Sequence, residues 1–375
     1  MAIYKIFPSQ DATIYSAYPA MNTGLDEILE ASTNFKTGIL QTNGEYPQAS
    51  RFLVQFDSND LAYVSASLIG TSSWTADLRL FVANSTGLSN TTTLAVNALS
   101  QSWDMGTGRY LDSPENENGV SWIWRTYSGG DAWLTSNFAT DSTGSYNLST
   151  NPQSAGGGVW WTLSESSQTF SYYSDLDLNF DVKSIVEKWN SGSWNNYGFI
   201  VRQTQSQKFI NDINEQVTLK YFSRDTHTIY PPCLEFKWDD SVYNTGSLTV
   251  LNTTPATILL SQNPGVFYDQ SVNIFRVNAR PTYPPKVWQT SSIYMTNYAL
   301  PEDSYYAIKD LDTNEMVIDF DTTYTKLSCD EYGSYFKLYM NGLEPERYYT
   351  VLVQTKIQGS TIVFDNNYSF KVVNP

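Results

Sequence analysis

The side chains that most often carry enzyme chemistry are sparse in this chain. His227 is the only histidine and lies in the turn-like segment Ser-Arg-Asp-Thr-His-Thr. No nucleophile motif accompanies it, so a Ser-His-Asp triad is not indicated. One histidine and two distant cysteines, Cys233 and Cys329, are too few ligands for a zinc site. The chain also lacks a phosphate-binding loop and a dinucleotide fingerprint. We therefore predict a non-enzymatic protein with no catalytic residue, metal or cofactor.

Acidic residues leave two alternatives to that prediction. The residues Asp175, Asp177, Asn179 and Asp181 begin like a calcium-binding loop. The pattern then fails, because Phe180 stands at the glycine position and Val186 at the position of the bidentate glutamate. Paired carboxylates for glycoside hydrolysis also stay open among 38 acidic residues, since only their separation in space decides such a role.

Tryptophan is the residue type most suited to binding in this chain. Six of the eleven tryptophans fall between positions 103 and 161. Aromatic faces can stack on sugar rings, but tryptophan in a β-sandwich is more often core. Adjacent Trp160 and Trp161 would point to opposite faces of a strand, so one of them could be exposed. We predict a mostly buried set, with Trp124, Trp160 and Trp161 as candidate contacts for a glycan or a partner protein.

Composition favours strands and turns over long helices. The 375 residues are 41% hydrophobic and 15% aromatic, but only 16% are charged. Serine, threonine, asparagine and glutamine must therefore supply most of the polar surface. The net charge is −16, and no cluster of lysine or arginine stands out. Nucleic acid and anionic membranes are poor partners for such a surface.

One stretch has a helical period. Val182, Ile185, Val186 and Trp189 fall at the spacing that places four apolar side chains on one face of a helix. Asp181 is a good N-cap, and Gly192 can adopt the left-handed conformation after the last turn. We predict one short helix that lies as a lid on a β-sandwich, with Asp181 and Trp189 as structural residues.

The remaining pattern predicts an all-β protein of two β-sandwich domains. The first domain spans residues 1–238 and is jelly-roll-like, with strands that include 11–15, 50–57 and 64–69. Residues 239–246 form the predicted linker. The second domain, 247–375, has the turn-separated short strands expected of an immunoglobulin-like sandwich. Its predicted strands are 248–251, 273–277, 305–309, 316–320, 335–339, 349–354 and 368–372.

The first domain resembles the DNRLRE-type β-sandwich family, a jelly-roll-like module related to carbohydrate-binding modules. The matching pieces, in order, are Asp11 to Ile14, Asn22 and Gly24, Ser50 and Arg51, Phe56 and Asp57, Val120 to Trp122, Asp181, Val182, Val186, Trp189, Asn196, Gly198, Phe199, Phe222 to Asp225, Pro231, Pro232 and Leu234. The helix and the closing piece are the most specific parts. The tryptophan-rich middle is longer than the family's pattern.

In the second domain, Leu343, Pro345 and Tyr349 look like the tyrosine corner of fibronectin type III domains. In that arrangement the tyrosine hydroxyl ties a strand to an upstream loop. Neither module is catalytic by itself, so both resemblances imply a binding or structural role.

The first ten residues, Met1 to Gln10, lack the apolar core and cleavage site of a secretory signal. No apolar run approaches the ~20 residues that span a bilayer. Because phage particles leave by lysis, a chain with an adhesin-like surface and no export signal resembles virion structural proteins of T4-like marine phages, in the tail or baseplate. We therefore expect a virion protein, made in the host cytoplasm, that docks with other virion proteins into a symmetric assembly. The alternative is a carbohydrate- or receptor-binding module that uses the tryptophan surface on host glycans.

Overall fold

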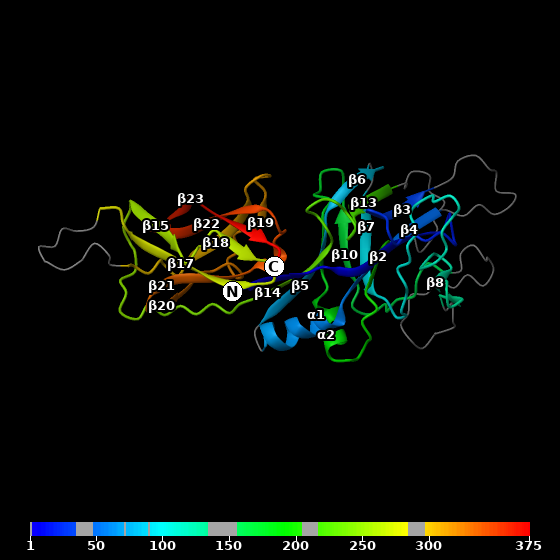
Figure 1. Cartoon of the computed structure of the whole chain (residues 1–375), viewed down its shortest axis with the longest axis horizontal. Helices are drawn as coiled ribbons and strands as arrows, with labels where there is room; N and C mark the ends of the chain where they lie inside the picture. Colours follow the sequence, from blue (N-terminus) through cyan, green and yellow to red (C-terminus); the bar gives the residue numbers. More distant parts are fainter. Residues whose placement is uncertain are drawn as a thin grey trace, which may run out of the picture. The chain divides into compact units, whose positions relative to one another are not determined.

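The structure, a computed structural model, is built almost wholly from β-strands. It describes residues 2–34, 48–70, 73–88, 91–133, 156–204, 217–283 and 297–375. The described strands form several sheets, with a few short helical segments between them (Figure 1). The predicted all-β, sandwich-like fold class is confirmed.

The chain divides into two compact units. The N-terminal unit comprises Ile6–Gly70 and Ala76–Glu235, and the C-terminal unit comprises Met1–Lys5, Thr71–Thr75 and Phe236–Pro375. This division lies close to the predicted boundary but assigns two short early segments to the C-terminal unit. That residues 1–238 and 247–375 fold as independent domains stays a prediction.

The N-terminal unit is organised on an eight-stranded sheet. Its strand order is β10-β7-β12-β4-β3-β13-β6, with β2 paired to β4, and all of these pairings are antiparallel. The bounds are β2 Pro8–Tyr15, β3 Ile28–Asn34, β4 Gln48–Phe56, β6 Val82–Thr86, β7 Thr92–Ala98, β10 Ser166–Phe170, β12 Phe199–Gln203 and β13 Val217–Phe222. Central strand β12 is buried along its whole length, as expected of a strand covered on both faces.

A four-stranded sheet has the order β1-β14-β5-β11. Its strands are β1 Ala2–Ile6, β14 Cys233–Trp238, β5 Trp74–Leu80 and β11 Leu178–Asp181. Within the N-terminal unit, Gln168 of β10 joins the edges of the two sheets. Its side chain donates to the carbonyl of Asp177 at 3.0 Å and accepts from the N–H of Asn179 at 2.9 Å. A side chain thereby satisfies backbone groups that an open strand edge would leave unpaired.

The predicted helix is present as α2, Lys183–Asn190. Ile185 and Val186 are fully buried, and the ring of Trp189 lies 4.7 Å from that of Phe199 in β12. The predicted N-cap is wrong by one residue. Val182 is the N-cap, and Asp181 ends β11, where its carboxylate accepts the N–H of Lys183 at 3.0 Å.

A second helical segment replaces a predicted strand. Residues 64–69 were expected to be a strand, but they form a π-helical turn, Val64–Ile69, that continues α1, Ser58–Tyr63. Asp57 caps this segment by accepting the N–H of Asn59 at 2.6 Å. Leu61, Val64 and Ile69 are the buried residues, so the apolar side follows a helical rather than an alternating spacing.

The C-terminal unit contains two further sheets, in the orders β15-β17-β21-β20 and β16-β23-β22-β18-β19. The bounds are β15 Ala256–Ser261, β16 Val266–Tyr268, β17 Val272–Pro281, β18 Ser304–Asp310, β19 Met316–Ile318, β20 Ser328–Asp330, β21 Gly333–Tyr339, β22 Tyr348–Ile357 and β23 Ser360–Val373. Six of the seven predicted strands overlap these elements. The seventh, 248–251, makes only an isolated bridge between Val250 and Ala299.

Stacked aromatic rings fill the core of the C-terminal unit. The ring of Phe336 lies 5.1 Å from that of Phe275 and 4.3 Å from that of Tyr306, and both pairs are nearly parallel. Tyr349 is buried beside them, and its hydroxyl donates to the carbonyl of Glu344 at 2.9 Å. The predicted linker is bound here as well, because Asn244 donates its N–H to the carbonyl of Cys329 in β20.

Candidate binding site

No group of three or more His, Cys, Asp or Glu side chains that could hold a metal ion occurs among the described residues. In the segment that begins like a calcium-binding loop, Asp177 instead forms a hydrogen bond with the backbone, since it accepts the N–H of Val82 at 2.8 Å. The His227 ring is almost fully exposed, 3.7 Å from a carboxylate oxygen of Glu27. No helix in the described part of the chain is long and apolar enough to cross a membrane.

The three candidate tryptophans do not form one surface. Trp160 is fully buried, so its assignment as a glycan or partner contact is wrong. It belongs to the hydrophobic core cluster of this unit, and the guanidinium groups of Arg51 and Arg202 lie over its ring, 5.3 and 4.8 Å from the ring centroid. Trp161 is half-buried and stacks on Trp194 with ring centroids 5.1 Å apart.

Trp124, the third candidate, is half-buried in the short strand β8, Trp124–Thr126, which pairs with β9, Asp131–Ala132. Its ring makes an edge contact with Tyr127 at a centroid distance of 6.0 Å. Trp124 therefore lies near the loop region from residue 104 to residue 118, which contributes to the lining of two cavities.

Asn22 fixes the backbone of that loop region from within the protein. Its side-chain amide donates to the carbonyls of Met105 and Val120 at 2.7 and 2.8 Å, and its side-chain oxygen accepts the N–H of Gly108 at 2.7 Å. Its own N–H donates to the carbonyl of Asn116 at 2.9 Å. One fully buried side chain thus pairs with backbone groups on both arms of the loop, which is typical of a buried polar residue that specifies a loop conformation.

Glycines make this close approach possible. A Cβ at Gly106 or Gly108 would collide with Asn22, and one at Gly119 would collide with Gly106. Gly106 also has a φ of +76°, in the left-handed region that favours glycine. The loop is therefore packed too tightly at its base to rearrange locally.

The segment Arg109–Asp112 projects from this base and carries two exposed apolar side chains. Tyr110 is 45% exposed and Leu111 is 58% exposed, and Leu111 has a left-handed backbone with φ of +58°. The Asp112 carboxylate accepts the N–H of Arg109 at 2.8 Å, and Asp26 accepts the N–H of Tyr110 at 3.1 Å. Strain of this kind persists only where surrounding contacts hold it, and such positions are enriched at ligand-binding sites.

Two cavities lie on either side of this segment. The first, which we call the Tyr110 pocket, has a volume of about 330 Å³. It is lined by Tyr15, Asp26, Glu27, Ile28, Glu30, Arg109, Tyr110 and Lys220. The second, the acidic pocket, has a volume of about 360 Å³. It is lined by Asp112, Pro114, Glu115, Asn116, Glu117, Asn118 and Tyr127. Both volumes fall at the lower end of the ~300–1,000 Å³ range of small-ligand sites.

The Tyr110 pocket combines an aromatic wall with charged groups. The Tyr110 ring lies 5.1 Å from that of Tyr15 and 6.0 Å from that of Tyr18. Burial raises the pKa of the Asp26 carboxyl, although the Tyr110 N–H opposes this shift. Lys220 pairs with Glu30 at 3.3 Å. The pocket therefore offers the partly exposed Tyr110 ring beside charged groups, and Asp26 and Lys220 are held in place by their own contacts with neighbouring residues.

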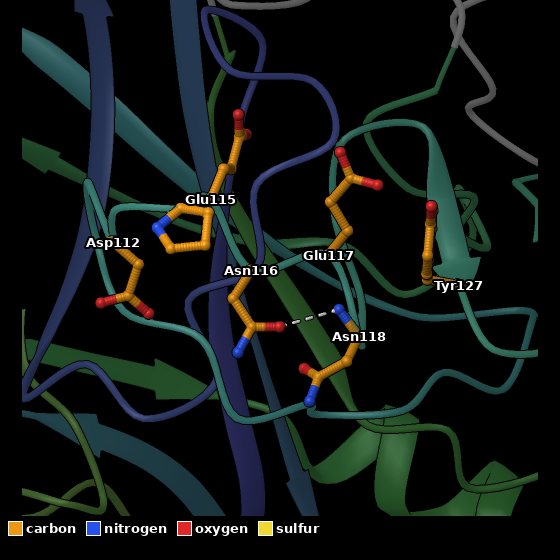
Figure 2. A pocket seen from close by; sticks show the side chains of 7 residues that line it. Asp112, Glu115, Asn116, Glu117, Asn118 and Tyr127 are labelled. Atoms are coloured by element: carbon orange, nitrogen blue, oxygen red, sulfur yellow. Dashed lines mark hydrogen bonds between the residues drawn. The ribbon is translucent and has the colours of Figure 1, made fainter.

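The acidic pocket has a different character. Figure 2 shows the carboxylates of Asp112, Glu115 and Glu117 pointing apart rather than converging on one point. Its asparagines are occupied within the loop, since Asn116 accepts the N–H of Asn118 at 3.1 Å (Figure 2). Asn118 in turn accepts the N–H of Thr107 at 2.9 Å. These groups stabilise the loop, and the arrangement resembles no binding constellation.

Sequence reasoning singled out tryptophans and missed Tyr110. Pairing of β13 with β3 brings Lys220 to this site, and the bonds of Asn22 and Asp26 bring Arg109 and Tyr110 to it, and no local pattern records these contacts. The available signal was indirect. Gly106 and Gly108 lie just before two apolar residues, Tyr110 and Leu111, in an otherwise polar loop.

Comparisons with known proteins identify no relative by sequence. No protein-family model and no curated protein matches the chain. Among solved structures, one match is a DUF4785 family protein from Legionella pneumophila, at 9% sequence identity and a TM-score of 0.19. The match covers all of this chain and 66% of that chain, so this chain spans just under two thirds of that protein's length. A similarity at this level carries no argument about fold or function.

Proposed function

We propose that this protein is a non-enzymatic structural component of a bacteriophage particle, in the tail or baseplate, that docks into a larger symmetric assembly. The observation that carries the proposal is an exposed apolar strand edge in the C-terminal unit. Val266 and Tyr268 lie on one face of edge strand β16 and are 52% and 62% exposed. The resemblance of the sequence to virion proteins supplies the setting.

Strand β16 is suited to docking by its position as well as by its side chains. It pairs with β23 on one side and ends the order of its five-stranded sheet. An edge strand that carries exposed apolar residues favours pairing with another chain, and natural proteins usually protect such edges. An assembly partner that covers Val266 and Tyr268 would remove both the open edge and the exposed apolar surface.

Mass spectrometry of density-purified phage particles tests this proposal. We expect the chain to be present at a fixed small-integer ratio to the tube proteins. Phage that carry Val266→Lys together with Tyr268→Lys should assemble particles depleted of this chain, whereas the matched exposed substitution Tyr173→Lys should leave its copy number unchanged. Absence of the wild-type chain from purified particles would refute the virion role.

A second candidate function, saccharide binding, is favoured by the Tyr110 pocket. An exposed aromatic ring beside carboxylate and guanidinium groups matches the apolar face and the flanking hydroxyls of a sugar ring. The two roles use different residues, because the pocket lies in the N-terminal unit and β16 in the C-terminal unit. Binding of the purified chain to a printed glycan array tests it, and an array without any bound glycan would refute it.

Trp124 and Trp161 are the two remaining candidate contacts on the tryptophan surface, because both side chains are half-buried. Trp160 is fully buried and is not a candidate. The array separates the two surfaces: loss of binding in Tyr110→Ala supports the Tyr110 pocket, whereas loss in Trp161→Ala alone would assign the site to the tryptophan surface.

A further inference from the structure

Carboxylates outnumber cations in the lining of the Tyr110 pocket. Three carboxylates line it, from Asp26, Glu27 and Glu30, against two cations, Arg109 and Lys220. Lys220 already pairs with Glu30 at 3.3 Å. Arg109 lies close enough to Asp26 to favour its ionised form, which opposes the effect of burial on that carboxyl.

A ligand that carries carboxylate or sulfate groups would meet a repulsive site. It would gain attraction only from cations that already face carboxylates, and it would approach three negative groups within one small cavity. The net charge of −16 on the chain also slows the encounter with a polyanion. An uncharged ligand avoids both costs.

The same groups are well placed for an uncharged polyhydroxy ligand. Carboxylates accept hydrogen bonds from hydroxyls, and a guanidinium donates to them, so Asp26 and Arg109 together offer both functions beside one ring. The Tyr110 ring supplies an apolar surface, and its edge contact with Tyr18 and tilted contact with Tyr15 restrict its rotation. Because Asp26 and Asp112 hold the backbone of this segment, little ordering entropy is lost on binding.

We propose that the Tyr110 pocket selects an uncharged pyranose residue of a polysaccharide, stacked on Tyr110 and hydrogen-bonded by Asp26 and Arg109, and that it rejects uronate-rich and sulfated glycans. This inference rests on the proposed saccharide-binding function and adds to it the chemical class of the ligand. It differs from the tryptophan hypothesis in both location and ligand chemistry.

Quantitative glycan-array binding of the full-length chain, with neutral, uronate-containing and sulfated glycans printed together, tests the selection. We expect bound glycans to be uncharged, and their apparent affinity to change less than about twofold between 50 and 500 mM salt, since screening acts on charge pairs. Tyr110→Ala should weaken binding by roughly tenfold or more, and Tyr110→Phe should stay within about threefold because the ring is kept.

Tyr127→Ala provides the matched control. Tyr127 is 40% exposed against 45% for Tyr110 and lies in the neighbouring acidic pocket, so its loss should leave the array pattern unchanged. The pair Glu27→Gln and Glu30→Gln, which removes two lining carboxylates that the proposal does not place on the ligand, should raise binding of acidic glycans while preserving neutral binding. Wild-type binding of acidic glycans that depends on Tyr110 would overturn the selection and leave saccharide binding intact. A blank array would overturn both.

Discussion

Two aspartates with the same low solvent exposure, Asp11 in the N-terminal unit and Asp310 in the C-terminal unit, have pKa values shifted in opposite directions. Asp11 and Asp310 are both 1% exposed. Burial raises the pKa of Asp11 to about 7, opposed mainly by one hydrogen bond from the N–H of Arg224. Burial also acts to raise the pKa of Asp310, but the hydrogen bonds from Arg347 and from backbone N–H groups lower it to about 2. Low solvent exposure alone therefore does not determine the protonation state of a carboxyl, because the hydrogen bonds that it accepts also count.

The contrast extends to how each unit holds its loops. The N-terminal unit uses buried polar side chains, such as Asn22, Arg51 and Arg202, that contact backbone carbonyls or aromatic rings. The C-terminal unit combines a stacked aromatic core with an ion pair at its margin, Arg347 and Asp310. The buried polar side chains of the N-terminal unit fix the shape of its loops, which suits a binding loop. The stacked rings and the ion pair of the C-terminal unit stabilise its strands, which suits docking.

The largest expected effect is that of Asp310→Ala. Asp310 accepts two hydrogen bonds from Arg347 at 2.6 and 2.8 Å, and two from the N–H groups of Asp312 and Thr313 at 2.9 Å. Its loss should lower the free energy of unfolding by about 3 kcal/mol at pH 7. Calorimetry measures this change. Asp312→Ala is the control, because its exposed carboxylate lies 4.0 Å from Arg347 and should contribute less than about 0.5 kcal/mol.

Asn22→Asp should produce a slightly smaller loss, about 2 to 3 kcal/mol. A carboxylate keeps the shape of the side chain but cannot donate to the carbonyls of Met105 and Val120, which then face negative oxygens. Urea denaturation followed by tryptophan fluorescence measures the change in the N-terminal unit. Asn118→Ala, an exposed asparagine of the same loop, should cost less than about 1 kcal/mol. Equal losses in the two variants would contradict the anchoring role of Asn22.

Asp11→Asn should change how the stability of the N-terminal unit depends on pH. The pKa of Asp11 is about 7 in the folded chain against ~3.9 in an unfolded one, so its favourable contribution is complete below pH ~4 and is lost as the pH rises through 7. The amide cannot ionise and can still accept the N–H of Arg224. The variant should therefore match the wild type near pH 4 and exceed it by more than about 1 kcal/mol at pH 8. A difference that stays constant over this range would contradict the raised pKa.

Much of the architecture could be predicted from the sequence, and the site could not. Helix α2 and the strands around Phe275 and Phe336 follow local periodicity, which needs no knowledge of distant residues. Residues 64–69 misled the prediction because a run of alternating small and apolar residues fits a strand as well as a helix, and the cap at Asp57 lies outside it. Trp160 was misassigned because its burial depends on Arg51 and Arg202, which approach it from other strands.

Tyr349→Phe is the smallest and most selective change. The buried hydroxyl of Tyr349 donates to the carbonyl of Glu344 at 2.9 Å, so its removal should cost about 1 kcal/mol, the usual net value of one hydrogen bond, and leave the ring in the core. Tyr348→Phe, at the adjacent and exposed position, should change the unfolding free energy by less than about 0.5 kcal/mol. If calorimetry instead found a loss of more than about 3 kcal/mol for Tyr349→Phe, this single hydrogen bond would contribute as much as the whole Asp310 network of the C-terminal unit. The stacked rings and the Arg347–Asp310 pair would then not be the main framework of that unit, and the proposed difference from the N-terminal unit would fail.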